Sequence, residues 1–185
     1  MFRRSLIAGA ATATLTGDFA AAQTKPSPDN TIYMDLKNGR VVIELFPDLA
    51  PKTVERIKTL ANQGFYDNTP FHRVIDGFMA QGGDPTGTGT GGSKLPDLPA
   101  EFTTQRRFLR GVCGMARTQD PNSGNSQFFI MFAPYPSLDG KYTIWGQVIQ
   151  GMEYVEMIKR GSGEGGTVAN PDRIVRMRVA SYTGK

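Results

Sequence analysis

Cysteine and histidine are almost absent from this chain of 185 residues, which contains one of each, Cys113 and His72. A single cysteine excludes an internal disulfide and any metal site built from several thiolates, and we interpret Cys113 as a buried core thiol. A single imidazole would have to serve any Ser-His-Asp site, and no serine lies in a Gly-x-Ser-x-Gly motif. The sequence therefore favours neither a hydrolase nor a metal enzyme, and we predict no metal and a structural role for His72.

Long hydrophobic runs are also missing. The most apolar stretch of the N-terminal region, residues 5–16, is rich in alanine and threonine, and Asp18 follows it. A transmembrane helix needs about 20 mainly apolar residues, so we expect no stable membrane insertion. The formal net charge is only +4 and is scattered along the chain, which argues against a nucleic acid or an anionic membrane as a partner.

The first residues have the order of a bacterial export signal. Arg3-Arg4 precedes the modestly apolar stretch, and the small residues Ala20-Ala21-Ala22 end it. We therefore predict a signal peptide over residues 1–22 and an exported protein that is periplasmic or secreted, and the sequence does not decide the exact cleavage site. The paired arginines also resemble the start of a twin-arginine signal, and the sequence does not decide between the two export routes.

The rest of the chain is long enough for one domain with its own core, which we place over residues 31–185. Residues 23–30, with two prolines, predict a flexible spacer ahead of it. Residues 31–37 and 40–46 alternate apolar and polar side chains, and the Asn38-Gly39 between them predicts a hairpin with a type I′ turn.

Helices are predicted at only two places, from Pro51 to Gly64 and over residues 152–160 before Gly161, where apolar residues recur at helical spacing. Further short strands are predicted over residues 71–74, 78–81, 111–116, 126–132, 142–148 and 173–181. Many short strands with two helices predict a mainly β fold, an antiparallel barrel whose open ends the helices cap.

The glycine-rich residues 82–92 raise a nucleotide-dependent enzyme as one alternative, since Gly87, Gly89 and Gly92 have the spacing of a dinucleotide-binding fingerprint. That fingerprint requires a strand before it and a helix at its end, and Pro96 disfavours a helix here. We therefore expect no nucleotide.

Two blocks combine apolar, amide and guanidinium groups in an unusual way. Residues 71–84 place Arg73 on one short strand and Phe78, Met79 and Gln81 on the next. Residues 126–130 form the second block. They place Gln127 and Phe129 on one face of a strand, because side chains alternate with a period of two.

These blocks, together with residues 111–116 and 138–141, closely resemble the cyclophilins, a family of peptidyl-prolyl cis-trans isomerases. The resemblance runs from about residue 31 to residue 181. It implies a closed eight-stranded antiparallel β-barrel capped by two α-helices, no cofactor, and a proline pocket on the outer face of the barrel. The pocket would be lined by Phe78, Met79, Phe129 and Leu138, with Met115 and Ala116 on its wall.

The resemblance also implies roles. Arg73 would donate to the proline nitrogen of the twisting peptide, and Gln81 and Gln127 would hold the peptide backbone. The backbone amide of Arg117 would bind the carbonyl that precedes the proline. A guanidinium carries a permanent charge, so such a site needs no titrating group near neutral pH.

Three positions depart from the best-known eukaryotic members. Arg117 replaces an asparagine, Ser137 aligns with a tryptophan at the pocket edge, and Tyr142 aligns with a pocket histidine. Trp145 falls at a core position and does not replace the lost tryptophan. We therefore expect turnover to persist, whereas the sequence does not decide whether cyclosporin binds.

The expected partners are proline-containing peptides and unfolded or exported proteins, and we expect a monomer. The alternative is a non-catalytic module or chaperone that holds proline-containing loops in the same pocket. The retention of Arg73, Gln81 and Phe129 favours turnover.

Overall fold

The computed structural model describes residues 25–184, so the predicted export signal at residues 1–22 lies outside the described residues. The described chain is mainly β, as predicted. The strands are β1 (Thr31–Leu36), β2 (Gly39–Leu45), β3 (Arg73–Ile75), β4 (Met79–Gly82), β5 (Val112–Met115), β6 (Phe128–Met131), β7 (Ile144–Gln150) and β8 (Arg176–Val179). The helices are α1 (Pro51–Asn62) and α2 (Met152–Glu156), with short 3₁₀ turns η1 (Pro28–Asn30) and η2 (Pro136–Leu138).

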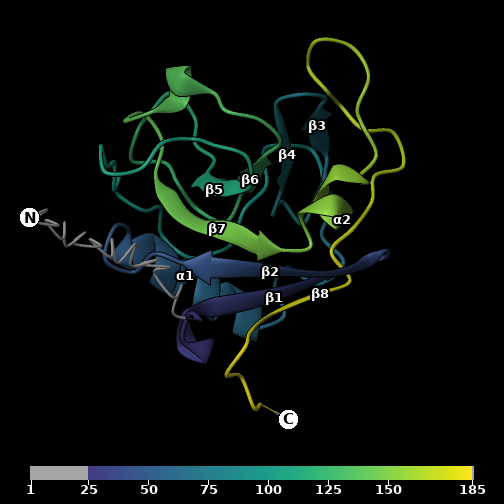
Figure 1. Cartoon of the computed structure of the whole chain (residues 1–185). Coiled ribbons are helices and arrows are strands. Elements are labelled where there is room, and N and C mark those ends of the chain that lie inside the picture. Colours follow the sequence, from purple (N-terminus) through teal and green to yellow (C-terminus); the bar gives the residue numbers. More distant parts are fainter. Residues whose placement is uncertain (1–24, 185) are drawn as a thin grey trace, which may run out of the picture.

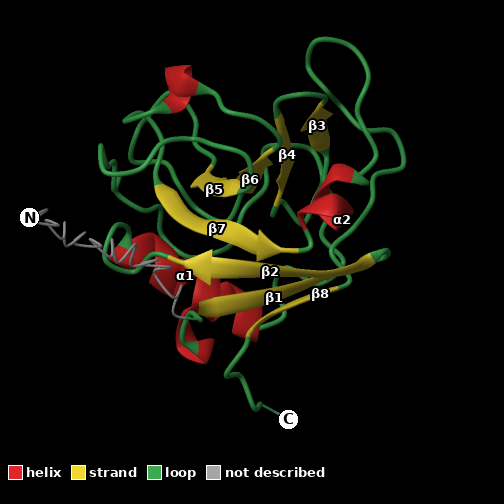
Figure 2. Ribbon diagram, viewed as in Figure 1, coloured by secondary structure: helices red, strands yellow, loops and turns green. Residues whose placement is uncertain are grey.

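All eight strands belong to one antiparallel sheet that curls into a half-barrel (Figures 1 and 2). Their order across the sheet is β3-β4-β6-β5-β7-β2-β1-β8. Most neighbours are therefore distant in sequence, and the sheet brings the two blocks of residues 71–84 and 126–130 side by side through the pairing of β4 with β6.

The predicted closure of the barrel is not seen, because the end strands β3 and β8 do not pair with each other within residues 25–184. Only an isolated bridge between Pro70 and Arg173 and a few nearby backbone hydrogen bonds link the two ends. The free edge of β3 is occupied instead by the loop after α2, since Val74 N donates to Gly166 O at 2.8 Å and Gly161 N donates to Val74 O at 2.9 Å. Pro70 also has no N–H with which to extend a ladder.

The first hairpin forms where it was predicted, but its turn is different. Leu36 pairs with Gly39, so the two turn residues are Lys37 and Asn38. A type I′ turn needs positive φ at both central residues, whereas Asn68 and Asn170 are the only non-glycine residues with positive φ in the described part. Gly39 is needed for space, because a Cβ there would lie 2.5 Å from the ring of Tyr154.

Helix α1 begins at Pro51 as predicted and buries Val54, Ile57 and Leu60 against the sheet. Helix α2 is shorter than predicted, ending at Glu156 instead of residue 160. No described helix is both long and apolar enough to cross a membrane.

The sheet has a buried cluster on each face, and β6 shows how the chain divides between them. Phe128 and Ile130 lie in the larger core with Trp145, while Phe129 and Met131 lie in a second cluster on the opposite face. This alternation is the period of two of an extended strand. Phe78, Ala116, Leu138 and Tyr142 pack against the second cluster, so the predicted pocket residues gather on the face away from the larger core.

Candidate active site

Three predicted site residues lie in one row across the sheet. Arg73 of β3 pairs with Gln81 of β4, and Gln81 pairs with Phe129 of β6. Directly paired residues in antiparallel strands point to the same face. The sheet register therefore places a guanidinium, an amide and an aromatic ring next to each other on the outer face.

This row opens onto a cavity of about 300 Å³. Every predicted site residue except Met115 and Gln127 lines it: Arg73, Phe78, Met79, Gln81, Ala116, Arg117, Phe129, Leu138 and Tyr142. Gln127 lines an adjoining cavity that shares Gln81, Ala116 and Arg117 with the first. The expectation that Met115 forms part of the wall is wrong, because its side chain is directed into the larger core and is 3% exposed.

A chain of hydrogen bonds fixes the polar side of the cavity. Arg73 Nη1 donates to Gln81 Oε1 at 3.2 Å, and Gln81 Nε2 donates to Gln127 Oε1 at 3.0 Å. Gln127 Nε2 in turn donates to the carbonyls of Gly89 and Gly91 at 3.0 and 2.8 Å. A guanidinium only donates and a carbonyl only accepts, so the two ends of the chain determine which way both amides face.

The guanidinium of Arg73 has a second anchor, which the sequence analysis missed. Its Nε donates to Gly165 O at 3.0 Å, and Arg73 forms a bridge with Thr167 of the same loop, the yellow-green segment that rises beside β3 in Figure 1. The loop can lie this close because Gly166 has φ +67° and a Cβ there would overlap Ile75. No ion pair to Arg73 is found within residues 25–184, so its charge stays available to a ligand.

The apolar side of the cavity is centred on Phe129. Its ring stacks with Phe108 at 5.6 Å between centroids and meets Tyr142 edge-on at 5.7 Å. Gly114, the partner of Phe129 across β5 and β6, leaves the room for this ring, because a Cβ there would overlap it. From the sequence, Gly114 was expected only as part of a strand, and no sequence signal marked its contact with the ring.

The glycine-rich loop is organised around Asp84, which is fully buried. Its carboxylate accepts hydrogen bonds from Thr86 N and Oγ1 at 2.8 and 2.7 Å, and from the N–H groups of Gly89 and Gly91 at 2.7 and 3.1 Å. Burial raises the pKa of Asp84, but these hydrogen bonds outweigh it and hold the pKa below its ordinary value. The loop N–H groups thus serve an internal carboxylate, and no helix follows them as a phosphate site requires.

His72 also lines the cavity but is 7% exposed, and neither ring nitrogen has a partner of good hydrogen-bond geometry among the described residues. Burial lowers the pKa of His72, against the opposing influence of the Asp84 carboxylate. The ring is therefore neutral near pH 7. The structural role expected for His72 stays a prediction.

Arg117 lies where the two cavities meet. Its guanidinium carbon is 4.5 Å from the centroid of the Tyr142 ring. Its backbone N–H donates no hydrogen bond within the described part of the chain, so this donor is free for a ligand carbonyl.

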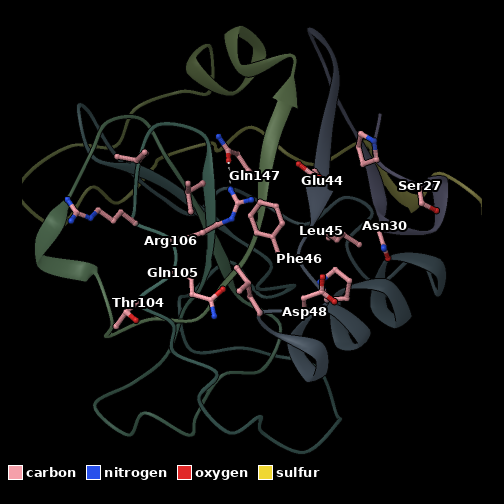
Figure 3. Close-up of a pocket in the computed structure, with 16 residues that line it drawn as sticks. Ser27, Asn30, Glu44, Leu45, Phe46, Asp48, Thr104, Gln105, Arg106 and Gln147 are labelled. Atoms are coloured by element: carbon pink, nitrogen blue, oxygen red, sulfur yellow. Dashed lines mark hydrogen bonds between the residues drawn. The ribbon is translucent and has the colours of Figure 1, made fainter. Parts of the chain in front are cut away.

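A larger hollow of about 910 Å³ lies elsewhere, between β2 and residues 104–107 (Figure 3). Arg106 lies over the ring of Phe46 at 3.9 Å from the centroid, and its Nη1 donates to Gln147 Oε1 at 3.4 Å. None of the predicted site residues is among the described residues that line it. A search of residues 25–184 finds no group of three histidine, cysteine or acidic residues that could hold a metal ion.

The chain is similar to known proteins. The model of the family of cyclophilin-type peptidyl-prolyl cis-trans isomerases matches residues 31–179, which is most of the described chain. The chain belongs to the cyclophilins. It is a peptidyl-prolyl cis-trans isomerase, as the resemblance implied.

Relatives of this cyclophilin agree with that assignment. A probable peptidyl-prolyl cis-trans isomerase of Brucella suis is 48% identical over 194 aligned residues, which cover 98% of each chain. Peptidyl-prolyl cis-trans isomerase-like 1 of Gibberella zeae is 43% identical over 154 residues, covering 80% of this chain and 93% of that protein.

Solved cyclophilins share the fold. The Cryptosporidium parvum cyclophilin, crystallised in the presence of the dipeptide Ala-Pro, has a TM-score of 0.74 and 32% identity, covering 82% of this chain and 99% of that one. The cyclophilin AquaCyp293 of Hirschia baltica has a TM-score of 0.76 and 30% identity, covering 86% of this chain and 77% of that one.

Proposed function

We propose that this cyclophilin accelerates rotation about X-Pro bonds by binding the twisted amide more tightly than the planar one, with Arg73 as the catalytic group and no covalent intermediate. The observation that carries the proposal is the position of Arg73, which Gln81 and Gly165 hold in the lining of the cavity that also contains Phe129, without an ion-pair partner in the described residues.

The chemistry needs no nucleophile. Amide resonance opposes rotation with a barrier of about 18–20 kcal/mol. At the midpoint of rotation that resonance is lost, so the proline nitrogen becomes pyramidal and accepts a hydrogen bond that the planar amide cannot accept. A guanidinium aimed at this nitrogen therefore stabilises the transition state more than either ground state. Arg73 has five N–H groups and uses two of them internally.

The other residues have three roles. Phe78, Met79, Phe129 and Leu138 hold the proline ring by apolar contact, and the free amide N–H of Arg117 binds the carbonyl before the proline. Both N–H groups of Gln127 are already used on Gly89 and Gly91. We therefore assign to Gln127 mainly the positioning of Gln81, with its Oε1 as a further acceptor for the peptide backbone.

The natural substrates are then proline-containing segments of unfolded or exported proteins, and the protein acts as a monomer in the periplasm or outside the cell. The composition of residues 1–22 supports export. N-terminal sequencing of protein from the periplasmic fraction tests it, with cleavage after Ala22 as the expected result. Replacement of Arg3-Arg4 by two lysines blocks export only if the twin-arginine route is used.

The experiment that tests the mechanism is isomerisation of a short Ala-Pro peptide, followed by NMR exchange or coupled proteolysis. Arg73→Ala should lower the catalysed rate by roughly 100-fold, the usual cost of removing a transition-state donor. Arg106→Ala, the matched loss of an arginine at the other hollow, should leave the rate unchanged. An unchanged rate in folded Arg73→Ala protein would remove Arg73 from the mechanism. Peptide binding without accelerated exchange by the parent protein would instead favour a non-catalytic binding module.

A further inference from the structure

Arg117 is held at the passage between the two cavities of the site. The first cavity, which takes the proline, and the second share Gln81, Gly89, Ala116 and Arg117. A peptide with its proline in the first cavity must pass these residues to reach the second. The side chain of a residue close to the proline is therefore brought to Arg117.

The guanidinium is fixed in place before any ligand binds. Its Nε and Nη2 donate to Lys141 O at 3.1 and 2.9 Å, and its Nη1 donates to Thr118 O at 2.9 Å. The ring of Tyr142 covers one face. Three of the five N–H groups of the side chain are thus used on neutral carbonyls, and two remain. A cation held in this way loses less conformational entropy on binding than a free side chain.

The charge of Arg117 is not neutralised by any carboxylate in residues 25–184, since it takes part in no ion pair there. The first cavity is lined by two permanent cations, Arg73 and Arg117, and its described lining contains no acidic residue. The second cavity has one carboxylate, Asp97, which is exposed and accepts from Asn125 Nδ2 at 2.9 Å. Arg117 therefore places a positive charge without an ion-pair partner where the cavities meet.

We propose that Arg117 makes this isomerase prefer substrates with a glutamate or aspartate within two residues of the proline. The preference rests on the proposed binding of the proline in the first cavity. A carboxylate meets the two remaining N–H groups of Arg117 in a charge-assisted hydrogen bond, while a lysine at the same place meets two cations.

The test uses pairs of proline peptides that differ only by glutamate or glutamine, with the acid placed in turn at each of the two residues before the proline and each of the two residues after it. The ratio of kcat/KM for each pair reports the preference. We expect a ratio of about three to five in favour of glutamate at one position or more, the range of a partly exposed ion pair. The ratio should fall toward one in about 1 M salt, because salt screens such a pair.

Two variants identify the source of the preference. Arg117→Gln should abolish the ratio, whereas Lys141→Gln, which removes an exposed cation from the neighbouring loop, should retain it. A ratio of one at every position in the parent protein, or a ratio that survives Arg117→Gln, overturns the inference. Turnover of the glutamine peptides by the parent protein tests the proposed function separately, so the two failures are distinguishable.

Discussion

Gln81 lies between Arg73 and Gln127 and is hydrogen-bonded to both, accepting from the first at 3.2 Å and donating to the second at 3.0 Å. Because Gln127 is bonded in turn to the glycine-rich loop, the orientation of Arg73 depends on a loop more than ten positions further along the chain. The proposed catalytic residue is therefore positioned by a network and not by its own strand alone.

Gln81→Leu should lower kcat/KM about tenfold, because a hydrogen bond to a charged group contributes about 1.5–3 kcal/mol and this one is only half-buried. Peptide isomerisation measures the loss. Gln147→Leu, the same change at the acceptor of Arg106, is the matched control and should leave activity unchanged. If the network acts as a unit, Gln127→Leu added to Gln81→Leu should cost much less than the sum of the two single changes. Additive losses would contradict a shared network.

Gly114→Ala should displace the ring of Phe129 and so distort the cavity proposed to bind the proline. A methyl group at this position overlaps the ring of Phe129, so the ring must move or the strands must separate. Overpacking of this kind costs roughly 1–3 kcal/mol of stability, which urea denaturation measures, and kcat/KM should fall with it.

Phe129→Leu provides the control for that prediction, since a smaller side chain leaves room for the added methyl group. The double variant Gly114→Ala/Phe129→Leu should be more stable than the sum of the single effects predicts. Simple additivity of the two stability losses would show that Gly114 is not required for the ring.

The strand positions of Arg73, Gln81 and Phe129 could be predicted from the sequence because each lies in a continuous block with an alternating pattern. Arg73, Gln81 and Phe129 were expected on strands, and the register confirms that they form one row. The anchor at Gly165 could not be predicted, because it is a backbone carbonyl on a loop 92 positions away. Every residue has a backbone carbonyl, so no residue type in the sequence marks this acceptor.

The predicted strands and helices were correct in place and less so in their ends and turns. The Asn38-Gly39 pair was interpreted as a turn signal. The structure shows instead that position 39 needs a glycine because the ring of Tyr154, from a distant part of the chain, leaves no room for a Cβ. The prediction of a closed barrel was wrong for a similar reason, because a loop and not β8 occupies the edge of β3. Tertiary contacts decided both features, and local sequence patterns do not contain them.

Cyclosporin should bind this cyclophilin weakly, and Ser137→Trp should tighten binding by roughly tenfold or more, the scale of a tryptophan contact at a binding site. Ser137 is exposed on η2 beside Leu138, which lines the proline cavity. Calorimetric titration measures the affinity, and isomerisation should continue in the variant because Arg73 is unaltered. Equal affinity of parent and variant would show that the edge of the cavity does not contact the drug.

Asp84→Asn should destabilise the folded protein by about 1–3 kcal/mol near pH 7, because the carboxylate accepts all of its hydrogen bonds and an amide NH₂ would face other donors. The pKa of Asp84 is lowered on folding, so the unfolded state takes up its proton first as the pH falls. Its contribution is thus fully present above the unfolded pKa of about 3.9 and is lost as the pH falls through the lower folded pKa. Denaturation from about pH 7 to pH 2 should therefore show the difference between parent and variant shrinking only below about pH 4.

Asp67 and Asp172 also have a lowered pKa. Their protonation in acid destabilises the parent protein and the Asp84→Asn variant equally, so it does not change the difference between the two. The pKa of His72 is also lowered in the folded protein. Protonation of His72 therefore begins to destabilise the fold at a higher pH, below about 6.5, and this effect is separable from that of Asp84. Asp48→Asn, at an exposed carboxylate with no ion pair within the described residues, is the control and should give a difference near zero at every pH. A constant gap between parent and Asp84→Asn down to about pH 2 would mean that the hydrogen bonds to Asp84 do not depend on its charge.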